Sequence, residues 1–313
     1  MRYPHLASLL FGQAHMIEPD KLDVILHVLA ARMDVPLHIE GHIAEIRADP
    51  SAYKAGAGIA ARTGDAWADV GGGVAVLPVT GTLVHRASGL DAMSGLASYG
   101  SLSSSFDAML ANSQISHIVL DLNSPGGSTS GAFDFADEVY NARGRKPITA
   151  IVDDSAYSAA YLIASAADEI VISRTGGVGS IGVVAAHMDR SASNDAAGIK
   201  VTYVYAGDRK IDGNANAPLS DEAHAALQGE VDRLYGMFVD TVARNRGLST
   251  AAVRDTKAAL YRGPSALQSR LADRMEVPRD ALRAIVASHQ SSAPSKSGRI
   301  QRAATAARIR ATT

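Results

Sequence analysis

The chain has 313 residues, of which 47% are hydrophobic and 20% are charged, and its formal net charge is −2. This composition is globular and excludes wholesale disorder, and the length allows one large domain or two smaller ones. The chain contains no cysteine, which excludes disulfide scaffolds, thiolate metal sites and cysteine nucleophiles. The near-neutral charge gives no reason to expect nucleic acid as a partner.

The first 73 residues predict two short regions. Residues 1–36 predict a small helical segment that starts at Glu18-Pro19-Asp20, and residues 37–73 are rich in glycine and alanine and predict a flexible connector. The opening residues are a poor secretion signal because their apolar stretch is short and no convincing cleavage site follows. No uncharged apolar run approaches the ~18–20 residues that a membrane span requires. We therefore expect a cytoplasmic protein without membrane association.

From residue 74 onward, short apolar runs alternate with helical stretches. The runs lack a clean apolar–polar alternation, which favours strands buried on both faces. Strand–helix alternation predicts an α/β fold with a mostly parallel sheet and right-handed crossovers. The predicted strands are 74–79, 118–122, 148–152, 169–173 and 201–205, and the predicted helices between them are 101–112, 130–143, 156–167 and 186–197.

The last hundred residues predict a helical region and then a tail. Ser220 caps a long helix that runs to Arg246, and shorter helices follow to about residue 288. Leu227, Val231, Leu234 and Phe238 form a stripe on the long helix, which either packs on the core or contacts another copy. Residues 290–313 contain basic but no acidic side chains and predict a disordered basic tail, which is either solvated chain or a docking segment for acidic surfaces.

Three turns at the carboxyl ends of predicted strands contain residue types suited to chemistry, and ligands of parallel sheets bind at this edge. Pro125, Gly126 and Gly127 form a turn whose bare N–H groups suit a phosphate or an oxyanion. Ser158 falls near the start of a helix of small residues, and Lys210 lies in a loop between two glycines. A lysine can act as a general base only when it is neutral, which requires burial. Each turn alone is unremarkable, but together they provide what a Ser–Lys acyl-transfer site needs.

These motifs are similar to those of the signal peptide peptidase A family of serine proteases. The similarity rests on Ser124–Gly127, Tyr157–Asp168, Gly179–Val183 and Gly207–Gly213. The opening Tyr3–Ser8, the run Val76–Leu83 and Lys210–Asn214 resemble the capsid assembly proteases of lambda-type phages within it.

The resemblance implies a Clp/crotonase-type fold of repeated strand–helix units, with a protease domain over residues 74–289. It implies that Ser158 is the nucleophile and Lys210 the general base. Backbone N–H groups of Gly126, Gly127 and Ala159 would form the oxyanion hole. No cofactor and no metal are implied. It further implies a homo-oligomeric head-maturation protease that cleaves scaffold, portal or capsid proteins within the procapsid, in the host cytoplasm.

Several alternatives stay open at this stage. A catalytically inactive assembly protein and a cellular signal peptide peptidase are the nearest ones. Gly177–Gly182 fits the G-x-G-x-x-G pattern of dinucleotide-binding proteins, although the nearest acidic residue after the next predicted strand is Asp208, well beyond the roughly 20 residues expected for a ribose-binding acid. A Ser-His-Asp hydrolase would need His85, His117 or His187 beside Ser158, yet no G-x-S-x-G elbow occurs. No histidine or carboxylate group shows metal-ligand spacing.

Overall fold

The structure is a computed structural model that describes residues 14–18, 22, 25, 67–86 and 96–292. Most of the predicted helical segment 1–36, most of the connector 37–73 and the tail beyond residue 292 lie outside the described residues.

The larger sheet confirms the predicted α/β architecture. Its strand order is β12-β10-β8-β6-β3-β2, with β9 pairing both β8 and β13. Strands β3, β6, β8, β9 and β10 run parallel to their neighbours among these five, whereas β2 and β12 are antiparallel edge strands. The bounds are β2 (Ala68–Gly71), β3 (Val74–Thr80), β6 (His117–Ser124), β8 (Ile148–Tyr157), β9 (Glu169–Ile172), β10 (Gly177–Gly179), β12 (Leu260–Arg262) and β13 (Arg274–Met275).

A smaller sheet lies beyond the carboxyl ends of the central strands. Its order is β11-β1-β7-β4-β5, so a strand near the N-terminus lies between two strands from the middle of the chain. The bounds are β1 (Ala14–Ile17), β4 (Thr82–Val84), β5 (Leu96–Ser98), β7 (Gly126–Ser128) and β11 (Val184–Ala185).

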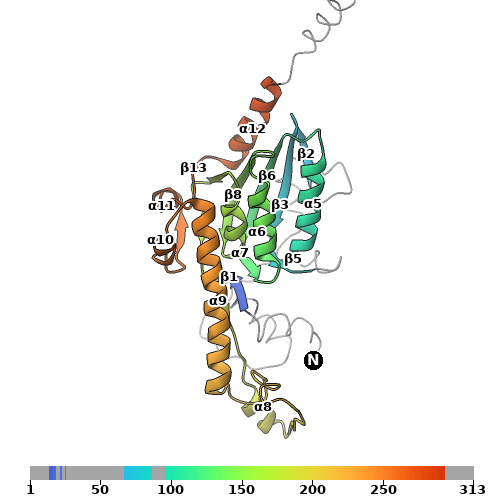
Figure 1. Ribbon diagram of the computed structural model, residues 1–313, viewed down its shortest axis with the longest axis vertical. Helices are drawn as coiled ribbons and strands as arrows, with labels where there is room; N and C mark the ends of the chain where they lie inside the picture. The colour runs from blue at the N-terminus through green and yellow to red at the C-terminus, as the bar shows by residue number, and fades with distance from the viewer. Residues whose placement is uncertain (1–13, 19–21, 23–24, 26–66, 87–95, 293–313) are drawn as a thin grey trace, which may run out of the picture.

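Helices cover both faces of the larger sheet (Figure 1). Alternate residues of each strand point to opposite faces, and two separate apolar clusters result. Leu77, Leu120 and Ala150 belong to the large cluster, which also contains residues of the helices at 99–111, 132–141 and 159–165. Val76 and Val119 belong to a small cluster that contains residues of the last helix, at 278–292. The strands are therefore buried on both faces, as their continuous apolar runs predict. The helices are α5 (Tyr99–Ala111), α6 (Ala132–Asn141), α7 (Ala159–Ser165), α8 (Ser191–Ala196), α9 (Asp221–Arg246), α10 (Thr250–Arg254), α11 (Pro264–Gln268) and α12 (Pro278–Ser292).

The long helix α9 matches its prediction closely. The Ser220 side chain accepts a hydrogen bond from the Ala223 N–H at the start, and Gly247 ends the helix in the left-handed conformation. Apart from Ala223, the buried residues of α9 lie in its C-terminal half and include Leu234 and Phe238. Its N-terminal half extends away from the sheet. Helix α8 and the residues next to it in the sequence lie at the far end of this half (Figure 1). Among the described residues, no helix combines the length and apolar character needed to cross a membrane.

Four local predictions differ from the structure. The helix predicted at 186–197 is the shorter α8, which begins at Ser191 and ends at Ala196. Residues 201–205 are exposed and form no strand, because they pair with no other strand among the described residues. Helix α7 begins three residues later than predicted, because β8 continues through Tyr157 to pair with β10. Strands β1 and β2 occur where a helical segment and a connector are predicted. Strand β1 is held by pairing with the distant strands β7 and β11, whereas β2 forms a hairpin with β3, the next strand in the chain.

A histidine pair fixes α12 to the larger sheet. His117 Nδ1 lies 3.0 Å from His289 Nε2, and His117 Nε2 lies 3.0 Å from Thr149 Oγ1. Burial, and secondarily the charge of His289, lowers the pKa of His117 to about 4, although Asp168 and Glu169 oppose this shift. His117 is therefore neutral in the folded protein at a pH where it is charged in the unfolded chain.

This pair predicts that the protein loses stability in mild acid. A histidine with a lowered folded-state pKa contributes its full stability above about pH 6.5, and that stability is lost as the pH falls toward 4. We expect the free energy of unfolding to fall by about 2 kcal/mol over this window, after allowance for solvent screening. Denaturant titrations at a series of pH values measure the change. His117→Gln should remove this component, whereas the exposed control His224→Gln should leave it; an unchanged pH profile in His117→Gln would rule out this histidine as its source.

Candidate active site

Ser158 lies at the junction between β8 and α7, which is where the sequence predicts a nucleophile. Its backbone has φ 54° and ψ −116°, a strained conformation for a residue with a Cβ atom. Its N–H donates to the Gly179 carbonyl at 2.8 Å and its carbonyl accepts from the Leu162 N–H at 2.9 Å. The surrounding strands thus hold the strain in place. A strained strand-to-helix turn is a geometry that presents a nucleophilic serine.

The side chain of Ser158 is fully buried. Its hydroxyl donates to the Gly182 carbonyl over 3.4 Å, a long hydrogen bond. None of the described histidines hydrogen-bonds to this hydroxyl: His117 lies beside His289, and His187 is bonded to the Asn214 carbonyl. The Ser-His-Asp alternative therefore finds no support in the described residues.

Gly126, one of the two predicted oxyanion glycines, lies directly against the residues on either side of Ser158. A Cβ atom on Gly126 would lie 2.9 Å from the Tyr157 carbonyl oxygen and 3.0 Å from the Ala159 nitrogen. Gly126 has φ 98°, which strongly favours glycine. Its N–H donates to Ser124 Oγ at 3.2 Å. Ala159 is the first residue of α7, so its N–H has no acceptor within the helix. Gly126, Gly127 and Ala159 thus lie near one another, and the N–H of Gly126 already has an acceptor.

The glycines at 177–182 have a structural explanation. A Cβ atom on Gly177 would lie 2.0 Å from Tyr157 Oη, so a side chain there would clash with the tyrosine that precedes Ser158. The turn after Gly179 leads to β11 rather than into a helix. A dinucleotide-binding turn needs a helix N-terminus for the pyrophosphate, and this turn lacks one. Ser180, also strained at φ 54° and buried, lies in the same turn.

Lys210 is not beside Ser158 within the single chain. It is exposed in a turn closed by its own N–H donating to the Gly207 carbonyl at 3.0 Å. Neighbouring Asp212 pairs with Arg209, at 2.9 Å, rather than with the lysine. We define residues 186–219 as the arm. The arm is held together internally, for example by Arg190 N–H donating to the Ala215 carbonyl, and lies at the far end of α9 from α7 (Figure 1).

Two parts of this site are not predicted from the sequence. The Gly182 carbonyl contacts the Ser158 hydroxyl, and a backbone carbonyl has no sequence signal beyond the glycine that carries it. Strand β1 pairs with β7, the strand that contains Gly126 and Gly127. Only pairing between residues more than 100 positions apart creates this contact. The described residues contain no cluster of three or more histidine, cysteine or acidic side chains that could hold a metal.

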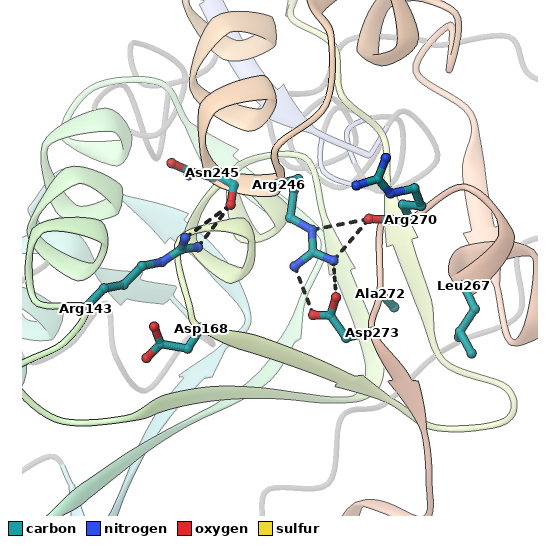
Figure 2. A pocket seen from close by; sticks show the side chains of 8 residues that line it. All are labelled: Arg143, Asp168, Asn245, Arg246, Leu267, Arg270, Ala272 and Asp273. Carbon is teal, nitrogen blue, oxygen red and sulfur yellow. Dashed lines mark hydrogen bonds and ion pairs between the residues drawn. The ribbon is translucent and has the colours of Figure 1, made fainter.

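An arginine fixes the other end of the short helix α7. Figure 2 shows Arg143 in a polar cavity that also contains the ion pair of Arg246 and Asp273. The Arg143 guanidinium donates to the carbonyls of Ser165, Ala166 and Ala167 at 2.6–2.9 Å, and to that of Asn245 at 3.2 Å. The C-terminal ends of α7 and α9 are thereby joined, and the donors of the guanidinium are used in this structural role.

We expect Arg143→Met to lower the free energy of unfolding by about 3 kcal/mol, because several carbonyls would lose a charged donor. Arg145→Met is the matched control, since Arg145 is exposed and its side chain makes no hydrogen bond in the described part of the chain. Denaturant unfolding measures both variants, and equal stabilities would show that the bonds to α7 contribute nothing.

Comparison with known proteins assigns a domain of the chain to a family. Residues 141–291, which include Ser158, α7 and Lys210, match the model of peptidase family S49. The chain carries a peptidase S49 domain. The resemblance to signal peptide peptidase A-type proteases inferred from the motifs is confirmed.

Individual relatives extend beyond this domain. The chain is 36% identical over 284 residues to head-tail preconnector protein GP5 of Enterobacteria phage P21, covering 89% of the chain and 56% of the relative. It is 34% identical over 286 residues to capsid assembly protease C of Escherichia phage lambda, covering 89% of the chain and 64% of the relative. A candidate signal peptide peptidase SppA of Enterococcus faecium is 28% identical over 167 residues, covering 53% of the chain and 48% of the relative. The chain thus spans less than two thirds of the length of each.

Proposed function

We propose that this S49 protein is a serine endopeptidase of the head-maturation type, with Ser158 as nucleophile. The observation that supports this most directly is the strained, buried Ser158 between the glycine strand β7 and the Gly182 carbonyl. The Ser158 oxygen would attack a peptide carbonyl and lose its proton to a neutral Lys210. The N–H groups of Gly127 and Ala159 would stabilise the oxyanion. Protonated Lys210 would then deliver the proton to the leaving amine, and water would hydrolyse the acyl-enzyme.

Lys210 would reach Ser158 from a neighbouring copy in a homo-oligomer. The segment of the arm at residues 199–205 exposes apolar side chains to solvent, including Ile199, Tyr205 and Val204, which is 98% exposed. Exposed apolar segments of this kind mark interaction sites. Within this segment, residues 201–205 pair with no strand in the described part of the chain, so their backbone groups can join another chain. Packing against a second copy would cover these side chains and bury Lys210, which a neutral lysine requires.

The biological setting is proposed from the phage relatives, one named as a capsid assembly protease and one as a head-tail preconnector. The substrates would be scaffold, portal or capsid proteins, cut within the procapsid in the host cytoplasm. The protease domain would comprise residues 74–289 in a Clp/crotonase-type fold, with residues 1–36, the connector 37–73 and the basic tail 290–313 outside it. A catalytically inactive assembly protein and a cellular signal peptide peptidase are the competing functions.

Mixing two inactive variants tests the shared site. We expect Ser158→Ala and Lys210→Ala each to be inactive toward peptides. When they are refolded together, sites that combine Ser158 of one copy with Lys210 of another should recover about a quarter of wild-type activity, on the assumption of random assembly in a ring. Size-exclusion chromatography with light scattering confirms assembly. No recovery in assembled mixtures would show that serine and lysine come from the same copy, and a monomer would exclude the oligomer.

A further inference from the structure

Strand β1 fills a gap between two strands of the candidate active site. On one side it pairs antiparallel with β7, with Met16 opposite Gly127. On the other side it pairs antiparallel with β11, with Ala14 opposite Ala185. Strands β7 and β11 make no pairing with each other, so β1 is the strand that joins them in the smaller sheet. Removing β1 would leave a slot with a free backbone edge on each side.

Both edges of this slot are connected to Ser158. Strand β7 contains the two glycines proposed for the oxyanion hole. Strand β11 begins two residues after Gly182, whose carbonyl accepts the hydrogen bond of the Ser158 hydroxyl. A chain lying in the slot therefore passes directly across the nucleophile.

The backbone of β1 directs a carbonyl at the proposed oxyanion groups. A Cβ atom on Gly126 would lie 2.3 Å from the Met16 carbonyl oxygen and 3.0 Å from the Ala159 nitrogen, so oxygen and nitrogen flank the same point. Hydrogen-bonded pairs alternate along an antiparallel ladder. The Glu18 N–H donates to the Pro125 carbonyl at 2.9 Å, so the next hydrogen-bonded pair is Met16 with Gly127. The Met16 carbonyl thus faces the N–H of Gly127, as a substrate carbonyl would.

The side chains of β1 are also buried in the manner of a bound peptide. Met16 is fully buried and belongs to the large apolar cluster, and Ala14, His15 and Ile17 are buried as well. The slot thus combines backbone pairing on both sides with an apolar cavity for a central side chain. Strand addition with a side-chain pocket is a recurring way to bind an extended peptide.

We propose that the slot between β7 and β11 is a binding groove for an extended polypeptide with an apolar central side chain, and that Ala14–Ile17 is its resident occupant. The chain's own strand blocks the groove, and a substrate enters only when β1 leaves. This inference rests on the proposed peptidase function, because it uses the same site. Since Lys210 lies far away in the single chain, the resident strand is held without the base needed to cut it.

A disulfide that can be opened tests the block. The chain has no cysteine, so Ala14→Cys with Ala185→Cys introduces the only two thiols, at paired positions of neighbouring strands within disulfide reach. The mismatched control combines Ala14→Cys with Val184→Cys, whose side chain points to the opposite face. We expect the matched pair to crosslink on oxidation and the mismatched pair not to. Failure of the matched pair to crosslink would overturn the placement of β1.

The readout is binding, which does not depend on catalysis. All variants carry Ser158→Ala, and the probe is a fluorescent peptide with the sequence of residues 12–19. Met16→Asp, which should expel the strand, is expected to bind the probe at least about 10-fold more tightly than the parent, because it removes a competitor held at high effective concentration. The oxidised matched pair should not bind the probe, and reduction should restore the parent affinity, a result that does not depend on Met16→Asp folding.

Equal probe binding by oxidised and reduced protein would overturn the groove, whether or not the protein is a peptidase. Conversely, probe binding that follows the disulfide, in a wild-type protein that cleaves no peptide, would leave the groove in place and remove the peptidase proposal. The two inferences therefore fail separately.

Discussion

Ser158→Ala is expected to lower the rate of peptide hydrolysis by roughly 10³-fold or more while the protein remains folded. The variant removes only the attacking oxygen, because alanine retains the Cβ atom and the same backbone requirement. Lys210→Ala should have a comparable effect, and the double variant should be no worse than either single one, since nucleophile and base act as a unit. Initial rates on a fluorogenic peptide and melting temperatures measure activity and folding in parallel.

Matched controls come from the same elements. Ser155→Ala replaces a serine of β8 whose hydroxyl donates to Asn123 Oδ1 at 3.2 Å, and Lys200→Ala replaces another exposed lysine of the arm. Both should retain activity within a few-fold of wild type. Full activity of Lys210→Ala would remove this lysine from the mechanism, and an equal loss in Lys200→Ala would indicate a general effect of charge on the arm.

Gly127→Ala is expected to have the largest effect on the fold of the site. A Cβ atom there would lie 1.9 Å from the Leu83 carbonyl oxygen and 2.6 Å from the Leu83 nitrogen. Leu83 is the residue of β4 that pairs with Gly127, so backbone would have to move to admit a methyl group. We expect the free energy of unfolding to fall by about 3 kcal/mol, and peptide hydrolysis to be lost because β7 moves relative to Ser158.

The control for this substitution is Gly236→Ala in the partly exposed middle of α9. A Cβ atom there meets nothing within 4 Å, and alanine favours a helix over glycine by about 1 kcal/mol. It should therefore stabilise the protein slightly. Denaturant unfolding compares the two variants, and a Gly127→Ala protein as stable as wild type would show that β4 and β7 do not approach as closely as described.

The larger sheet is predicted well from the sequence because its central strands are continuous apolar runs separated by helices. Strands β3, β6, β8 and β9 fall where such runs occur. The short strands β1 and β7 escape prediction, because Gly126–Ser128 has no strand propensity and its pairing partner lies more than 100 residues away. The run at 201–205 is apolar and β-branched, yet its side chains are exposed in the single chain. Its pattern fits a strand whose partner would have to come from another copy.

The candidate site is likewise predictable from the sequence only in part. Ser158 and the glycine turn are recognisable because they follow β8 and β6, whose carboxyl ends lie at one edge of the sheet. Sequence does not reveal that Ser158 is strained, since that depends on β8 continuing to Tyr157 and pairing with β10. The sequence also does not predict how far Lys210 lies from Ser158, because this distance depends on the direction in which α9 extends from the sheet and on the position of the arm at its end.

The measurement that tests the central proposal most directly is covalent labelling of the native, assembled protein with a fluorophosphonate, followed by mass spectrometry of its peptides. An activated serine reacts with such a probe, whereas an ordinary buried hydroxyl does not. We expect a single phosphonate adduct on Ser158 in the wild-type protein, and none in Ser158→Ala. An assembled, folded protein that remains unlabelled at Ser158 even when Met16→Asp has removed β1 from the groove, or that is labelled at another serine, would contradict it.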